Sequence, residues 1–139
     1  MGHFHIAPLV LAVLLLCCCR DTVTSRYETR TDAEADRLFE RGWLPEIIPQ
    51  SSYDLSTKND LDANVSEGGF FFTDATEFIG HLRKMKAAEV SGSDSARFME
   101  KGYWPYSYRT NQSWWIFFIN RDKGHCEYRM GLINTRGSP

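Results

Sequence analysis

The 139-residue sequence has few cysteines, and their spacing is not that of a disulfide framework. Three of the four are consecutive, Cys17–Cys19, and Cys126 stands alone far downstream. A small domain without paired cysteines must be stabilised by its hydrophobic core. An excess of basic residues is also lacking, because 16 Lys and Arg stand against 18 Asp and Glu, for a net charge of -2. This balance gives no support for nucleic-acid binding.

The sequence also lacks the common catalytic motifs. It has no G-x-S-x-G, no phosphate loop and no dinucleotide fingerprint. Glu77 and His81 lie one helical turn apart, which suits a surface pair better than a catalytic one. His125 and Cys126 are adjacent in a predicted strand, so their side chains point to opposite faces. We therefore predict a protein that is not an enzyme and has no catalytic residues, metal site or cofactor.

A hydrophobic run long enough to span a bilayer is absent as well. Ile6–Leu16 contains eleven uncharged residues, whereas a transmembrane helix needs roughly 20. The run leads directly into Cys17, and it resembles the signal peptide of a bacterial lipoprotein, in which an acylated cysteine becomes the first mature residue. We expect lipidation at Cys19, because Leu16 lies three residues before it, with Cys18 as the second choice. A retained apolar anchor and an ordinary signal peptide cut further on are the alternatives.

This interpretation divides the chain into three parts: a signal peptide over 1–18, a polar tether over 19–30 and a folded domain over 31–135. A strand near Tyr27 is the alternative for the end of the tether. The resemblance implies a protein anchored in the bacterial cell envelope by lipid, facing the periplasm or the exterior. Arg20 follows Cys19 directly, and Asp21 comes one position later, so the choice between inner and outer membrane stays open.

Three helices are expected. Thr31 and Glu34 have the spacing of a capping box that begins the first helix, and Gly42 ends it. A second helix begins at Thr73 or Asp74, and a short third one runs from about Asp94 to Lys101. The residues of the second helix with helical apolar spacing are Phe78, Ile79, Leu82 and Met85.

The strand prediction is clearest near the C-terminus. Trp114–Asn120 is rich in β-forming residues, 121–124 has turn chemistry, and His125–Ile133 returns with alternating polarity. This alternation places Cys126, Tyr128, Met130 and Leu132 on one face, so the thiol is expected to be buried. Phe70–Phe72 reads as a buried strand, and 46–69 as mostly loop with a strand at Tyr53–Ser56. The predicted fold is a single small α+β domain with an antiparallel sheet of four to five strands and two to three helices packed on one face.

Two segments of nine residues, 37–45 and 97–105, repeat the same pattern 60 positions apart. In each segment a glycine ends a short helix, an aromatic residue directly follows the glycine, and a proline comes two positions after that aromatic residue. The pattern predicts two equivalent corners between helix and strand, from either a duplication or convergence on one way to end a helix. The residues concerned, expected to be structural, are Gly42, Trp43, Pro45, Gly102, Tyr103 and Pro105.

The first of these segments opens a longer motif. R-G-W-L-P at 41–45 is followed by Pro49, Ser51 and D-L-D-A-N at 60–64. This pattern resembles small bacterial envelope proteins with a YbbD head domain, over about residues 27–72, and the resemblance implies location and fold but no activity. Asp60, Asp62 and Asn64 begin like a calcium loop, but later positions lack the glycine and glutamate that such a loop needs. They are expected to build a turn, and the alternative is a weak calcium site that they form together with Glu67.

Aromatic residues are plentiful, at 14% of the chain. Trp114 and Trp115 cannot share one face of a strand, so one ring must cover the other side or stay partly exposed. With Tyr106 and Tyr108 they are the candidate binding residues. The function that we expect is a non-catalytic envelope lipoprotein that binds a protein or an envelope polymer. The alternative is a periplasmic inhibitor or immunity-type protein that blocks an enzyme with an exposed loop, such as Ser51–Glu67.

Overall fold

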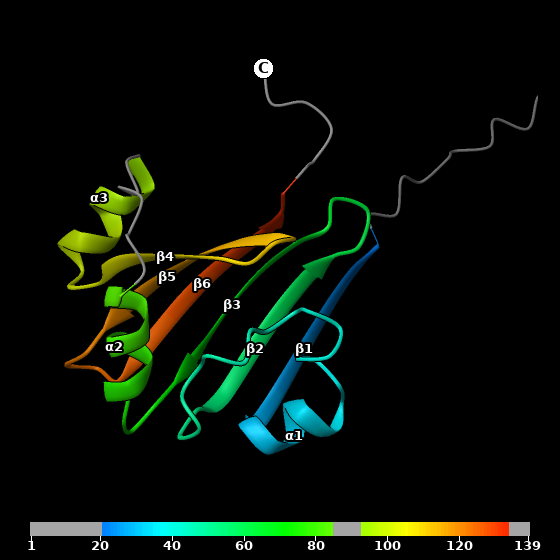
Figure 1. Ribbon diagram of the computed structural model, residues 1–139, viewed down its shortest axis with the longest axis horizontal. Helices are drawn as coiled ribbons and strands as arrows, with labels where there is room; N and C mark the ends of the chain where they lie inside the picture. The colour runs from blue at the N-terminus through cyan, green and yellow to red at the C-terminus, as the bar shows by residue number, and fades with distance from the viewer. Residues whose placement is uncertain (1–20, 85–92, 134–139) are drawn as a thin grey trace, which may run out of the picture.

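The computed structural model describes residues 21–84 and 93–133, which form one six-stranded antiparallel sheet with three helices (Figure 1). The strand order is β1-β2-β3-β6-β5-β4. The sheet has more strands than the four to five predicted. The strands are β1 Thr22–Thr29, β2 Tyr53–Asp60, β3 Val65–Phe71, β4 Trp104–Arg109, β5 Ser113–Asn120 and β6 His125–Leu132, and the helices are α1 Arg30–Ala35, α2 Thr76–Lys84 and α3 Ser93–Glu100.

The segment expected to be a tether is an edge strand over most of its length. Residues 22–29 form β1, which pairs with β2 in antiparallel register. Tyr27 packs against the hydrophobic core, and Arg26 on the other face forms an ion pair with Asp54 at 2.7 Å. Residues 22–29, which were assigned to the tether, are therefore part of the sheet.

The segment predicted to be mostly loop, 46–69, contains β2 and the start of β3. The buried face of this hairpin carries polar residues, Thr57, Asn59 and Ser66, which hid the alternation of a strand. Ser66 Oγ donates to Asn59 Oδ1 at 2.6 Å, so two of these polar groups satisfy each other inside the fold. At the turn, Ala63 N donates to Asp60 Oδ1 at 2.9 Å.

The first helix begins two residues earlier than predicted. Thr29, and not Thr31, is its N-cap, and the capping box is completed by Asp32. Asp32 N donates to Thr29 Oγ1 at 3.2 Å, and Thr29 N donates to Asp32 Oδ2 at 3.0 Å. The helix ends at Ala35, and turns carry the chain on to Gly42.

Helices cover both faces of the sheet, which corrects the expectation that all lie on one face. Phe117 and Phe118 are neighbours in β5 and point to opposite faces. Phe78 of α2 contacts the Phe117 ring edge-on at 5.2 Å, whereas Phe98 of α3 stacks on Phe118 at 4.0 Å. We call the side with Phe117 the inner face and the side with Phe118 the outer face.

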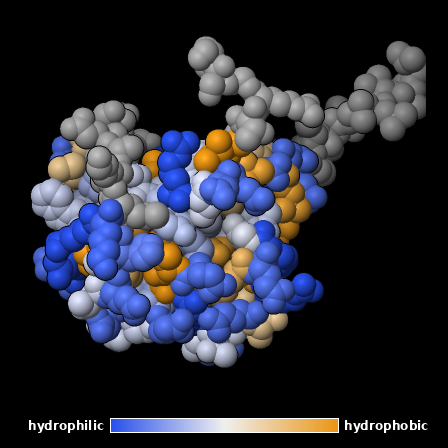
Figure 2. All heavy atoms as spheres, in the orientation of Figure 1, coloured by the Kyte–Doolittle hydropathy of each residue, from blue (hydrophilic) through white to orange (hydrophobic). Residues whose placement is uncertain are grey.

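The inner face holds the main hydrophobic core. Phe78, Ile79 and Leu82 are buried there, as predicted, and Met85 lies outside the described residues. No helix within residues 21–84 and 93–133 has the length and apolar composition to cross a bilayer. Figure 2 shows that hydrophilic residues cover much of the visible surface and that hydrophobic residues are visible along its upper edge and across its middle.

The hairpin of β5 and β6 confirms the prediction for the C-terminal part. Cys126, Tyr128 and Met130 are buried on the inner face. Burial raises the pKa of the Cys126 thiol well above its usual value, so the group is held protonated and unreactive. Leu132, predicted on the same face, is 44% exposed because it lies at the end of the sheet.

The two repeated segments form the same corner. Gly42 and Gly102 adopt positive φ angles of 76° and 81°. Gly42 N donates to Phe39 O at 3.0 Å and Gly102 N to Met99 O at 2.9 Å. In each corner the backbone amide after the glycine, that of Trp43 or Tyr103, donates a hydrogen bond of 3.0 Å to the carbonyl oxygen five residues earlier. These two bonds define a Schellman motif, which needs a residue with positive φ at the glycine position.

The equivalence extends beyond the corners. From Ser56 to its turn, the hairpin of β2 and β3 has the same register as the hairpin of β5 and β6, 60 residues later; nearer Tyr53 the register of the first hairpin shifts by one residue. At the centre of the sheet β3 pairs with β6, and Gly68 lies opposite its own counterpart, Tyr128. The two hairpins are therefore related by an approximate two-fold axis perpendicular to the sheet.

Candidate binding cleft

A cleft of about 480 Å³ opens between the first corner and the turn that joins β4 to β5. One wall is the segment 39–46, and the other is formed by Tyr108, Thr110, Gln112 and Ser113. Trp115 and Met130 form its floor on the inner face of the sheet, with Asn64 and Leu132 at one end. Segments from both halves of the chain thus build one site.

The first wall is shaped by the Schellman corner. Because Gly42 reverses the chain, Leu44 and Pro45 are buried beneath the wall, while Trp43 is half-buried and packs against the core. Arg41 stays exposed at the rim, with its Nη2 atom 3.2 Å from Asp36 Oδ2. The wall therefore contributes an aromatic ring and, at the rim, a guanidinium group that is paired with Asp36.

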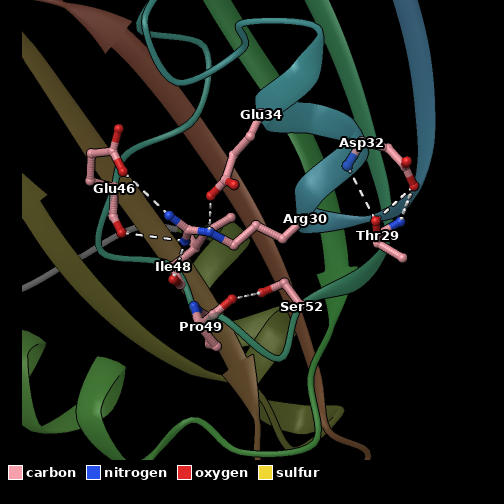
Figure 3. Close-up of polar contacts among 8 residues, drawn as sticks. All are labelled: Thr29, Arg30, Asp32, Glu34, Glu46, Ile48, Pro49 and Ser52. Atoms are coloured by element: carbon pink, nitrogen blue, oxygen red, sulfur yellow. Dashed lines mark hydrogen bonds and ion pairs between the residues drawn. The ribbon is translucent and has the colours of Figure 1, made fainter.

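Arg30 fixes this wall from behind (Figure 3). Its side chain is only 4% exposed, and its guanidinium lies over the Phe39 ring at 4.4 Å. Nε pairs with Glu34 at 2.7 Å, and Nη1 donates to the Ile48 carbonyl at 2.5 Å. Nη2 reaches Glu46 Oε2 at 3.3 Å, so one buried cation holds α1 to the segment that follows the corner.

The second wall is a tight polar turn. Ser113 N donates to Thr110 Oγ1 at 2.9 Å, and Gln112 N donates to the same oxygen at 3.2 Å. Trp115 Nε1 donates to Ser113 Oγ at 3.0 Å, which satisfies the indole of the buried floor residue. The turn thus places hydroxyl groups and the Gln112 side chain along the cleft above an aromatic floor.

The cleft brings together several residues that the sequence singled out separately. Gly42, Trp43, Pro45 and Asn64 come from the motif, and Tyr108 and Trp115 from the aromatic candidates. Trp115 is only 2% exposed, so it acts as floor and core rather than as an exposed contact.

The other candidates lie elsewhere. Tyr106 packs against the core without lining the cleft. Trp114 is half-buried on the outer face, where its ring lies so close to Gly131 that a Cβ there would approach it to 2.6 Å. Asp60 serves the turn at the end of β2, because its Oδ1 accepts from Ala63 N, whereas Asp62 Oδ2 accepts from Asp21 N just before β1. Gly102, Tyr103 and Pro105 belong to the second corner.

The second corner contacts the histidine of β6 instead of a cleft. The Tyr103 hydroxyl lies 2.9 Å from His125 Nδ1, and the ring of Phe71 lies 4.5 Å from the imidazole. Burial lowers the pKa of His125, and this effect outweighs the attraction of the Glu127 carboxylate. Among the described residues, no group of three or more His, Cys, Asp and Glu side chains could hold a metal ion.

Sequence reasoning missed Arg30 and three residues of the second wall, Thr110, Gln112 and Ser113. The T-x-x-S spacing of Thr110 and Ser113 is a local turn signal that could have indicated the second wall. Nothing in the sequence near Arg30 shows that it would be buried, because its partners at Glu46 and Ile48 are distant and include a backbone carbonyl.

The family model for the YbbD head domain matches residues 21–71. These residues are β1, α1, the first corner, β2 and β3, so the match ends where the first half of the sheet ends. The first half of this chain is therefore similar to the YbbD head domain. No curated protein and no solved structure matches the chain.

Proposed function

We propose that this protein is a non-catalytic binding module of the bacterial envelope, held at a membrane by acylated Cys19 and using the cleft to bind an envelope polymer. One observation carries the binding role: the family motif and the aromatic residues, far apart in sequence, converge on one open cavity of about 480 Å³. Ligand sites are commonly such concave, mainly apolar cavities with a few well-placed polar groups.

The chemistry of the cleft favours a polymer with both apolar and hydroxyl-bearing surface. Trp43 and Tyr108 contribute aromatic rings to the lining, and exposed Gln112 contributes an amide. The hydroxyl groups of Thr110 and Ser113 hold the turn in place through their bonds within it. The rim carries one positive and one negative side chain, Arg41 and Glu46, so its formal charge is balanced. A glycan chain has sugar rings with an apolar face and polar edges, which match this combination.

The inhibitor alternative receives less support. The loop expected to block an enzyme, 51–67, is largely β2 and the start of β3 and lies within the sheet. Only the four residues of the 61–64 turn project from it. A partner protein bound in the cleft stays as the second outcome of the test.

The test is a titration of the purified protein with soluble glycan fragments from bacterial cell walls, followed by calorimetry. We expect Gln112→Ala and Tyr108→Phe each to weaken binding about tenfold, the effect of one lost hydrogen bond of about 1.4 kcal/mol. Trp104→Ala is the control, because Trp104 is 59% exposed and lies at the opposite end of β4 from the cleft.

Three results would count against the proposal. Equal weakening by the Trp104 control would place binding outside the cleft. Absence of glycan binding, with one soluble enzyme captured at one-to-one stoichiometry, would favour the inhibitor alternative. An intact mass from membranes that starts at residue 1 without acyl groups would refute the anchor.

A further inference from the structure

Exposed aliphatic side chains gather at one end of the sheet. Val23, Leu61, Val65 and Leu132 are 43%, 38%, 40% and 44% exposed. Among the described residues, the other large exposed hydrophobic side chains are Tyr53, Met99 and Trp104, none of which is at this end. We call the end that carries the four aliphatic side chains the aliphatic end.

Strand register places these four residues together. Thr22 of β1 pairs with Asp60, Asp60 pairs with Val65, and Val65 pairs with Gly131. Val65 is itself one of these paired residues. Val23, Leu61 and Leu132 directly follow Thr22, Asp60 and Gly131 in the sequence, so all four aliphatic residues lie at or next to this set of paired residues at the end of the strands. In Figure 1 the start of β1, the turn between β2 and β3 and the end of β6 lie close together at the top of the sheet. Figure 2 shows hydrophobic residues along the same edge.

The chain enters the fold at this end. Leu61 N donates to Asp21 O at 3.0 Å, and Asp21 N lies 3.4 Å from Asp62 Oδ2, so Asp21 is held against the turn. Cys19 is two residues earlier, and two residues of extended chain span at most about 7 Å. An acyl group on Cys19 therefore leaves no room for a flexible tether between the bilayer and the aliphatic end.

We propose that the aliphatic end is a lipid-contacting surface, on which the domain stands with its strand ends against the membrane. This inference rests on the proposed anchor at Cys19. Val23 and Leu132 lie on the inner side of the sheet and Val65 on the outer side, so these side chains flank the strand ends and do not share one face. Exposed apolar side chains are costly in water, and the interface of a bilayer is the apolar phase within reach of this end. The cleft shares Leu132 and Asn64 with this end, so its ligand would be held close to the membrane surface.

The charges at the same end indicate which lipids it would meet. Asp21 and Asp62 are exposed there, and Asp60 is half-buried beside them. Arg109, at the end of β4, is exposed on the same row of the sheet, so this end carries charges of both signs. We therefore expect contact with the zwitterionic lipids phosphatidylethanolamine and phosphatidylcholine.

Quenching by brominated lipids tests the contact directly. The full chain, purified from membranes, carries a fluorophore on Leu61→Cys or, as a matched control at the opposite end, on Met99→Cys. Each is reconstituted into phosphatidylcholine and phosphatidylethanolamine vesicles with brominated acyl chains. We expect several-fold quenching at position 61 and none at position 99. Adding Val65→Glu should reduce the quenching at position 61, because it places a charge in the contact.

The outcomes separate the inference from the proposed anchor. Equal quenching at positions 61 and 99, or none at either, overturns the lipid contact. No quenching at position 61 together with slow labelling there by a water-soluble thiol reagent would show that a second copy of the chain covers this end, which also overturns it. Intact mass is measured on the same samples, and a mass without acyl groups refutes the anchor at Cys19. The quenching result still tests whether the aliphatic end contacts lipid, because quenching reports lipid contact whether or not the protein is acylated.

Discussion

Arg30 is the residue on which the first wall of the cleft depends most. It is buried, whereas its carboxylate partners Glu34 and Glu46 are 45% and 77% exposed. The ion pairs themselves therefore contribute little, and the bond to the Ile48 carbonyl and the contact with Phe39 contribute most. A buried cation here links three segments that have no other covalent or metal cross-link among the described residues.

We expect Arg30→Met to lower the free energy of unfolding by about 2–4 kcal/mol, since it leaves a buried carbonyl without its donor and frees the wall of the cleft. Urea denaturation measures the change. Glu46→Gln is the matched control and should cost less than about 1 kcal/mol, because it alters only an exposed ion pair. Equal losses for the two variants would show that the ion pair, and not the buried bond, carries the effect.

His125 gives the fold a dependence on pH. Its pKa is lowered in the folded state by burial, so the unfolded chain binds the proton more readily. The stability contributed by neutral His125 is present above its ordinary pKa of 6.5 and is lost as pH falls from there toward the folded value.

The thermal midpoint should therefore fall as pH is lowered below about 6.5, and His125→Gln should make this fall shallower. Glutamine can still bond the Tyr103 hydroxyl but does not titrate. His81→Gln replaces an exposed histidine and serves as the control. An unchanged pH profile in His125→Gln would assign the dependence to other groups.

At the scale of elements, the two corners are equivalent in backbone but differ in surroundings. A Cβ on Gly42 meets nothing within 4 Å, whereas one on Gly102 approaches Asn120 Nδ2 at 3.1 Å. Both have positive φ, which costs a residue with a side chain roughly 1–2 kcal/mol. Glycine is therefore required at both positions mainly because of the positive φ angle, and the space available for a Cβ atom is a smaller factor.

Gly42→Ala and Gly102→Ala should each lower the free energy of unfolding by about 1–2 kcal/mol, with Gly102→Ala the more severe. Gly80→Ala is the matched control: Gly80 lies inside α2 with nothing within 4 Å of its Cβ position, so alanine there should raise stability by about 0.5–1 kcal/mol. Calorimetric melting measures all three. A stabilising Gly42→Ala would contradict the Schellman assignment.

The strands were predicted well where polar and apolar residues alternate clearly along the sequence, and poorly where they do not. The hairpin of β5 and β6 was predicted almost to the residue, because its inner face is apolar and its turn chemistry is clear. The hairpin of β2 and β3 was largely missed, because Thr57, Asn59 and Ser66 occupy positions where apolar residues were expected. The internal repeat was the unused signal, since the same register recurs 60 residues later.

The candidate site was predictable only in its parts. The sequence indicated Trp43 and Tyr108 separately, from a motif and from aromatic content. Their meeting in one cleft depends on β4 lying at the far edge of a sheet whose centre is the β3–β6 pair. That pairing joins residues about 60 positions apart, and no local pattern specifies such a long-range contact.

At the scale of the whole molecule, the two halves share one sheet and one core. The seam between them is formed by seven residue pairs of β3 and β6, and a Cβ on Gly68 at its centre would come within 2.0 Å of the Ser56 carbonyl oxygen. Residues from both halves, including Leu55 and Phe117, belong to the same buried cluster. The similarity to the YbbD head domain ends with β3. In this chain the free edge of β3 is paired with β6 from the second half.

A shared sheet and core should make the halves unfold together, even though only the first resembles a known unit. Leu55→Ala, which empties a position 1% exposed in the first half, should lower stability by about 2–5 kcal/mol. Cys126 reports on the second half, because its thiol is fully buried there. We expect the urea concentration at which Cys126 becomes reactive to fall by the same amount as the midpoint of backbone circular dichroism. If Cys126 stays protected while half of the backbone signal is lost, the halves unfold separately, and the β3–β6 seam joins two units rather than completing one fold.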